Sequence, residues 1–229
     1  MKQIIHKLIL FLLLGSFGVV PAGATIFEHA FEECDYTNRD WGMKFSYLNR
    51  KFKYTYDRQT MTADVYGNPK KAEHGFVMGV RYSPYFGHGQ GLVTGLDCRA
   101  LFSSLEVDGI DCLMAEVGLY LPLMYRFTLP LSDDFSVFVQ TGLGMYLGLV
   151  RDLDPMDDDY EDIDVGFGES DDWYNPNQFQ LSVPMGFGFT YKALTVEATY
   201  NVGLTNNSAL ITEGKCKESI WEAGISIGF

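Results

Sequence analysis

Long apolar segments and basic residues are both scarce in this chain of 229 residues. Only the N-terminus has a run that approaches the roughly 20 apolar residues of a membrane-spanning helix, which excludes a multi-span helical bundle. The chain has 17 lysines and arginines against 30 aspartates and glutamates, and its formal net charge is −13. It therefore lacks the clustered cations that bind phosphate backbones, and no nucleic-acid partner is expected.

Cysteine and histidine are also rare, with four residues of each. Cys34, Cys98, Cys112 and Cys216 have neither the spacing of a compact disulfide framework nor a metal-type C-x-x-C pair. Their pairing is left open by the sequence. By contrast, 24 glycines and 15% aromatic residues are present in a chain with only 8 prolines. This composition favours an all-β fold with crowded or sharply curved strands.

The N-terminal segment has the three parts of a secretory signal peptide. Lys2 and Lys7 give a basic start, Leu8 to Val20 form a short apolar stretch, and residues 21–24 are small in the A-x-A pattern. A membrane anchor is the alternative, but the apolar stretch is short for one and no basic stop-transfer cluster follows. We predict a signal peptide over residues 1–24, with cleavage after Ala24, and a short periplasmic segment over residues 25–40.

From Trp41 onward, apolar and polar residues alternate with a period of two. Residues 179–191 and 194–204 alternate strictly and are separated by two residues, the spacing of a tight hairpin. Six further runs predict strands, for a total of eight: 41–47, 76–82, 92–102, 112–127, 135–149 and 221–229.

The two faces of these strands differ in a way that decides the fold class. One face is apolar, whereas the other is mostly Gly, Ser, Thr and Gln with few charges, unlike a water-exposed surface. The charges on the second face are balanced, as groups that must pair in a buried interior should be. They form the predicted lumen ion-pair network: Lys44, Arg81, Arg99 and Arg126 with Asp97, Glu116, Glu197 and Glu222. The sequence therefore predicts an eight-stranded antiparallel transmembrane up-and-down β-barrel over residues 41–229, with its apolar face toward lipid.

The connections between the predicted strands support this orientation. Residues 55–74, 151–177 and 205–219 are long and 103–111 intermediate, whereas 83–91, 128–134 and 192–193 are short. Short periplasmic turns and long external loops are typical of outer-membrane barrels, which places the N-terminus of the barrel in the periplasm. Aromatic residues at the short-turn ends predict an interfacial girdle: Trp41, Tyr82, Tyr125, Phe127, Phe135, Tyr191 and Phe229.

Nearly all of the chain after the signal segment resembles the eight-stranded outer-membrane β-barrel family of the OmpA and OmpX type, in the version with a PorT-like outer membrane protein β-barrel domain. The resemblance is carried by residues 120–127, 142–148 and 198–206 and by the terminal Phe229. It implies a bacterial outer-membrane location and makes Phe229 an assembly signal read by the barrel-assembly machinery. It does not imply one activity, because the family includes adhesins, stability factors and secretion-associated proteins.

Three functions remain open at this point. An eight-stranded barrel has an interior just wide enough for side chains, and inward-facing Tyr120, Phe138 and Tyr146 favour a plugged lumen with a structural or surface-interaction role for the external loops. A small transport channel is the first alternative. A lipid A-modifying barrel enzyme is the second and weaker one, because it needs a histidine beside a serine and a carboxylate. His74 with Ser103 or Ser219 is the best such set; we predict no enzyme and no catalytic residues.

An acidic run dominates the longest predicted connection. Dense carboxylates are suitable ligands for Ca²⁺ or Mg²⁺, although such runs are more often simply solvated. The candidate ligands are Asp154, Asp157, Asp158, Asp159, Glu161 and Asp162, and no other cofactor is expected. The expected partners are outer-membrane lipid and lipopolysaccharide, the assembly machinery, and an extracellular protein or glycan at the loops, with the protein itself a monomer.

Overall fold

The structure, a computed structural model, describes residues 40–56, 59–63, 72–107, 110–155, 178–206 and 215–229. Ten strands occur in these ranges: β1 (Trp41–Tyr56), β2 (Gln59–Ala63), β3 (Glu73–Tyr82), β4 (Tyr85–Gly87), β5 (Gln90–Val107), β6 (Ile110–Pro130), β7 (Phe135–Pro155), β8 (Phe179–Tyr191), β9 (Leu194–Gly203) and β10 (Lys215–Gly228). None of the described residues forms a helix with the length and apolar character needed to cross a bilayer.

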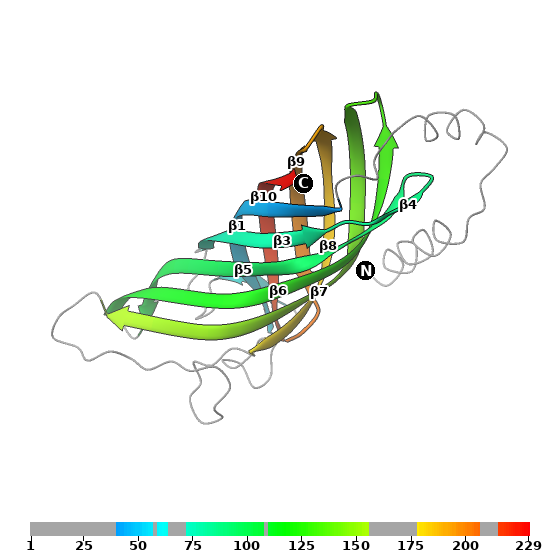
Figure 1. Cartoon of the computed structure of the whole chain (residues 1–229). Helices are drawn as coiled ribbons and strands as arrows, with labels where there is room; N and C mark the ends of the chain where they lie inside the picture. The colour runs from blue at the N-terminus through cyan, green and yellow to red at the C-terminus, as the bar shows by residue number, and fades with distance from the viewer. Residues whose placement is uncertain (1–39, 57–58, 64–71, 108–109, 156–177, 207–214) are drawn as a thin grey trace.

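Eight of these strands form one closed antiparallel barrel (Figure 1). Each of β1, β3, β5, β6, β7, β8, β9 and β10 pairs with the next, and β10 pairs with β1 from Gly42↔Gly228 to Thr55↔Lys215. The predicted fold class is therefore confirmed. The other two strands are short additions, since β2 pairs with the end of β1 beyond β3, and β4 pairs with the start of β5.

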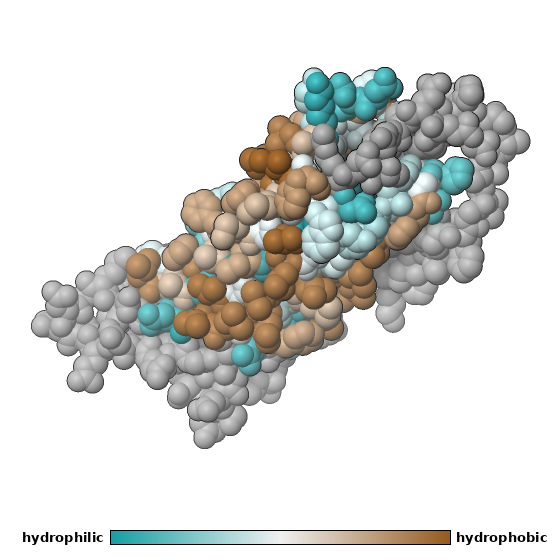
Figure 2. Space-filling view, viewed as in Figure 1, coloured by the Kyte–Doolittle hydropathy of each residue, from teal (hydrophilic) through white to brown (hydrophobic). Residues whose placement is uncertain are grey.

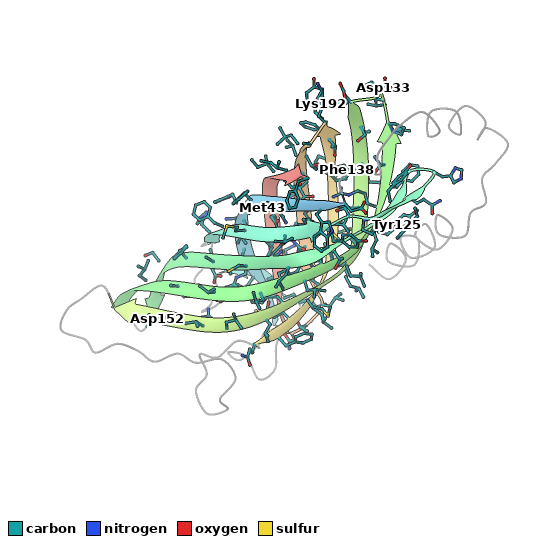
Figure 3. The ribbon with its side chains drawn as sticks, viewed as in Figure 1. Met43, Tyr125, Asp133, Phe138, Asp152 and Lys192 are labelled. Carbon is teal, nitrogen blue, oxygen red and sulfur yellow. The ribbon has the colours of Figure 1, made fainter. Side chains whose placement is uncertain are left out.

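The two faces of the barrel wall have the polarity that the sequence predicts. Phe76 and Phe187 on the outer face are 65% and 63% exposed, whereas Lys44 and Asp97 on the inner face are 1% and 0% exposed. Figure 2 shows apolar residues over the middle of the strands, and hydrophilic residues at the tip that the β6–β7 and β8–β9 turns form. Asp133 and Lys192 mark that tip, and Asp152 lies at the far end of the barrel (Figure 3). This barrel has a polar inside and an apolar outside.

A β-bulge interrupts the alternation in β7. The register with β6 passes from Val117↔Val150 to Gly118↔Gly148, so Leu149 is an extra residue. Leu149 and Val150 both lie on the outer face, and Arg151, which strict alternation would place outside, is buried in the lumen.

All four predicted connections at the long-loop end are shorter in the structure than in the sequence analysis. The predicted connection 55–74 contains β2, and the predicted connection 103–111 is almost entirely strand, because β5 ends at Val107 and β6 begins at Ile110. The predicted connection 151–177 begins inside β7, which continues to Pro155. The predicted connection 205–219 ends inside β10, which begins at Lys215. At this end of the barrel the strands extend beyond the apolar belt. The predicted signal peptide and nearly all of the predicted segment 25–40 lie outside the described residues.

Candidate functional site

The lumen is the most strongly charged region in the described part of the chain. It holds as many cationic as anionic side chains, six of each, nearly all of them buried. They are Lys44, Arg50, Arg81, Arg99, Arg126 and Arg151, and Glu73, Asp97, Glu116, Glu197, Glu218 and Glu222.

The lower ionic network occupies the half of the lumen near the short turns, which lie toward the top of Figure 3. Lys44 of β1 pairs with Glu222 of β10, and its Nζ lies 3.3 Å from Oδ2 of Asp97 and 3.5 Å from Oε1 of Glu197. Arg81 of β3 contacts the same two carboxylates, at 3.4 Å from Asp97 and 3.3 Å from Glu197. Because the carboxylates come from β5, β9 and β10, the network joins opposite walls of the barrel.

Two arginines extend this network and cover aromatic rings. Arg99 donates to Glu222 at 3.0 Å, and its guanidinium carbon lies 3.4 Å from the ring centroid of Tyr120. Arg126 donates to Gln140 at 2.8 and 2.9 Å and lies 3.6 Å from Glu197. A guanidinium over an aromatic face adds cation–π attraction to its ion pair, so these side chains are held on two sides.

An upper ionic network lies nearer the long loops. Arg50 of β1 donates to Glu73 at 2.5 Å and makes two bonds to Glu116, at 2.8 and 2.7 Å. Tyr146 donates to Glu116 at 2.7 Å, and Arg151 lies 3.9 Å from the same carboxylate. Glu116 therefore accepts hydrogen bonds from side chains of β1 and β7 at once.

An apolar layer separates the two networks along several strands. Leu48, Val77, Leu101 and Ile220 form one buried cluster on β1, β3, β5 and β10. On β1, Leu48 falls between Lys44 and Arg50 on the inner face. The layer covers the side of the lumen formed by β10, β1, β3 and β5.

Two tyrosines fill the opposite side of the lumen. Tyr120 and Tyr146 are strand partners and are 3% and 4% exposed. Tyr120 donates to Asn201 of β9 at 2.9 Å. Glycine is required beside them, because a Cβ at Gly144 would collide with the Tyr120 ring and one at Gly118 with the Tyr146 ring. The inward glycines thus make room for large side chains inside a narrow barrel.

Some lumen atoms have no hydrogen-bond partner among the described residues. They include Oδ1 of Asp97, Nε of Arg99, Oε1 of Glu73 and Oε2 of Glu218. Buried polar atoms of this kind are ordinarily bonded to water. Water is therefore the expected occupant of the remaining space, rather than an apolar ligand.

The structure divides the eight predicted lumen residues between the two networks. Seven of them lie in the lower network, and Glu116 lies in the upper one. Sequence reasoning missed Arg50, Glu73, Arg151 and Glu218. The inward alternation of β1 and β10 continues through the first and the last of these, but their outer neighbours are polar, so the apolar signal stops before them.

The histidines do not form a catalytic set in the described residues. His74 lies exposed on the outer face, where its Nδ1 contacts the Tyr47 hydroxyl and lies 3.3 Å from Nδ2 of Asn49. Ser103 is buried on the inner face, so His74 and Ser103, which belong to the best set that the sequence offers, lie on opposite faces of the barrel wall. His88 lies exposed in the turn after β4, with a positive φ of 51°.

The predicted metal ligands lie outside the part of the chain whose side chains the structure describes. This applies to Asp157, Asp158, Asp159, Glu161 and Asp162 and to the side chain of Asp154. Among the described residues, no group of three or more His, Cys, Asp and Glu side chains is arranged to hold a metal ion. The Ca²⁺ or Mg²⁺ site stays a prediction.

Closure of the barrel and the polarity of its two faces together define the class of protein. In a bilayer every backbone polar group must be satisfied internally, which only helices and closed barrels achieve. An even-stranded antiparallel barrel with an apolar outer belt and paired charges inside is a transmembrane β-barrel of the bacterial outer-membrane type.

Comparison with known proteins gives remote structural likenesses. No protein family model matches the chain, and no curated protein sequence matches it. Among solved structures it is similar to Ail, the attachment invasion locus protein of Yersinia pestis, with 12% identity, a TM-score of 0.37 and coverage of 83% of this chain and 99% of Ail. It is similar to Neisserial surface protein A with 10% identity, a TM-score of 0.38 and coverage of 82% and 97%. For OprG from Pseudomonas aeruginosa the identity is 12%, the TM-score 0.38 and the coverage 86% and 98%. The fold assignment rests on the strand pairing itself.

Proposed function

We propose that this protein is a small outer-membrane barrel with a closed lumen, and that its role is structural or one of surface interaction through the long loops. One observation carries the proposal: the lumen contains two cross-wall ionic networks with the apolar layer of Leu48, Val77, Leu101 and Ile220 between them. Conduction would require these ion pairs to separate and the apolar layer to become hydrated. In a barrel of eight strands the side chains fill the interior.

Planar-bilayer recording of the protein tests this proposal. A closed lumen gives no sustained current, and the folded protein moves differently in SDS gels before and after boiling. Sustained conductance of porin size would replace the proposal with a small transport channel. Recovery of the protein as a soluble periplasmic monomer would overturn the membrane assignment itself.

Several earlier predictions belong to the same proposal. Residues 1–24 direct export, Phe229 is read by the barrel-assembly machinery, and the barrel acts as a monomer without enzymatic activity. The outward position of Phe229, which is 68% exposed and bonds through its N–H to Trp41 O at 2.9 Å, is compatible with such a recognition element at the end of β10. The lipid belt suits lipopolysaccharide and phospholipid, and the long loops suit an extracellular protein or glycan.

A further inference from the structure

Three lysines lie on the outer face of the barrel at its long-loop end, just beyond the apolar belt. Lys51 and Lys53 are exposed on β1, and exposed Lys217 on β10 is the direct strand partner of Lys53. Directly opposite residues of an antiparallel pair have Cβ atoms about 5 Å apart, and like charges at that position destabilise the sheet. The two ammonium groups of Lys53 and Lys217 thus repel each other across the β1–β10 pair.

No described carboxylate offsets this charge. Within the ranges that the structure describes, none of the three lysines forms an ion pair, whereas Lys192 at the opposite end of the barrel pairs with Asp134 at 3.7 Å. The chain as a whole is strongly acidic. Among the described residues of this rim, cations are therefore in local excess, which suits an anionic ligand.

An apolar groove of about 490 Å³ lies on the same outer face, nearer the short turns. Its lining combines larger side chains on β1 and β3 with small residues on the two flanking strands, β10 and β5. The lining includes Phe45, Tyr47, Phe76, Met78, Ala100 and Ala223. A groove of this chemistry inside a lipid belt fits a hydrocarbon chain.

The groove and the lysines are spaced as the acyl chain and the headgroup of one lipid are. Lys53 follows Tyr47 by six residues on the same face of β1, which is about 20 Å along a strand, or about 14 Å in height at the roughly 45° tilt of barrel strands. The polar contact between Tyr47, which lines the groove, and His74 lies at the end of the groove nearer the lysines. Lysine stems can also extend along an apolar surface toward an interface, so the ammonium groups lie at the level of a lipid headgroup.

We propose that this face of β10, β1, β3 and β5 binds a membrane lipid that carries a phosphomonoester, with an acyl chain in the groove and the phosphate between Lys53 and Lys217. The inference rests on the proposed function, which places this rim at a membrane interface. A phosphomonoester has a charge of about −1.5 to −2 at neutral pH, which matches two lysines, whereas a phosphodiester neutralises only one. Free phosphate does not use the groove.

Lipid titration of the protein, purified from membranes in mild detergent, tests the proposal. Native mass spectrometry counts the bound molecules, and the probe is diphosphoryl lipid A, compared with dephosphorylated lipid A and with phosphatidylglycerol. Each of Lys53→Gln and Lys217→Gln lowers the affinity for diphosphoryl lipid A about fivefold. Lys192→Gln, the matched control at the other end, leaves it unchanged. Ala223→Leu, which fills the groove, weakens the binding of phosphorylated and dephosphorylated lipid alike.

Three results would overturn the proposal. In the first, the unaltered protein and the Lys53→Gln/Lys217→Gln variant bind diphosphoryl lipid A equally well. In the other two, the unaltered protein binds phosphatidylglycerol, or free phosphate, as tightly as it binds diphosphoryl lipid A. Lys53→Arg keeps the charge and is expected to retain the affinity. A loss of affinity in Lys53→Gln is then due to the lost charge and not to misfolding. The gel shift on boiling is measured for every sample. If the gel shift persists and the lipid preference is absent, the proposed lipid site is wrong and the membrane barrel is unaffected. If the unaltered protein shows no gel shift, the proposed function itself is wrong.

Discussion

Arg50 of β1 and Glu116 of β6 are joined across the lumen by two parallel hydrogen bonds, from Nη1 to Oε1 at 2.8 Å and from Nη2 to Oε2 at 2.7 Å. In the sheet, β3 and β5 lie between these two strands, so the pair connects walls that share no backbone hydrogen bonds. A bidentate arginine–carboxylate pair is both strong and directional. It therefore holds the barrel cross-section in shape at the level of the upper network.

Removing one partner of this pair destabilises the barrel. We expect Arg50→Met to lower the free energy of unfolding by about 3 to 5 kcal/mol, because Glu116 loses its main cation while it stays buried. The measurement is urea unfolding in lipid vesicles, followed by the gel shift. Asp134→Asn, which breaks the exposed pair with Lys192, is the control and costs at most about 1 kcal/mol.

Replacing both partners separates a structural contact from an uncompensated charge. In Arg50→Met/Glu116→Met no charge of the pair is left without its partner, so the double variant is more stable than the sum of the single losses predicts. Strictly additive losses in the same unfolding measurement would mean that the two residues act independently.

Gly118 is required by its neighbour rather than by its own backbone. Gly118→Ala is expected to destabilise the barrel by about 1 to 3 kcal/mol through overpacking against the Tyr146 ring. Tyr146→Ala in the same chain removes that collision, so a double-mutant cycle gives a favourable coupling energy. Ala198→Val on the outer face adds a larger volume, but toward lipid, and changes stability by less than about 0.5 kcal/mol. An equal effect of Gly118→Ala with and without Tyr146 would contradict this account.

The bulge at Leu149 can be detected without a structure. Spin labels at Leu149→Cys and Val150→Cys are both expected to be mobile and accessible to collision reagents, because both positions face outward. Strict alternation would bury one of them. Labels at Leu147→Cys and Gln140→Cys provide the outward and inward references. A buried label at either position 149 or 150 would remove the bulge.

Phe229 is expected to act in assembly more than in stability. Phe229→Ser lowers the amount of protein in the outer membrane, whereas Phe229→Tyr keeps an aromatic end and restores it. Quantitative immunoblotting of membrane fractions measures both, and the gel shift reports whether the assembled fraction is folded. Unchanged outer-membrane levels of Phe229→Ser would remove the signal role.

Within the lipid belt, the sequence is sufficient to predict which way each strand faces. Phe76, Met78 and Val80 alternate with inward residues because hydrocarbon demands an apolar outer face at every second position. The same rule gave the seven lower-network residues. Lys44, Asp97 and Glu222 stand out as charges in otherwise apolar or glycine-rich runs.

Beyond the belt the same rule loses its physical basis. On β1 the outer residues become Lys51 and Lys53, while inward Leu48 and Phe52 are apolar, so polarity no longer distinguishes the faces. Arg50 could therefore not be assigned to the lumen from the pattern alone. Arg151 was missed for another reason, since the bulge depends on pairing between β6 and β7 that no single strand reveals.

Closure of the barrel has a kinetic consequence. The seam joins β1 to β10, and the bridge from Lys44 to Glu222 links residues near the two ends of the folded sequence. Contacts this distant along the chain slow folding, because a long loop must be ordered before they form. Until the seam closes, both terminal strands offer unpaired edges to neighbouring chains, a recognised route to aggregation. Protection of these two strands during insertion is thus a condition for reaching the native barrel.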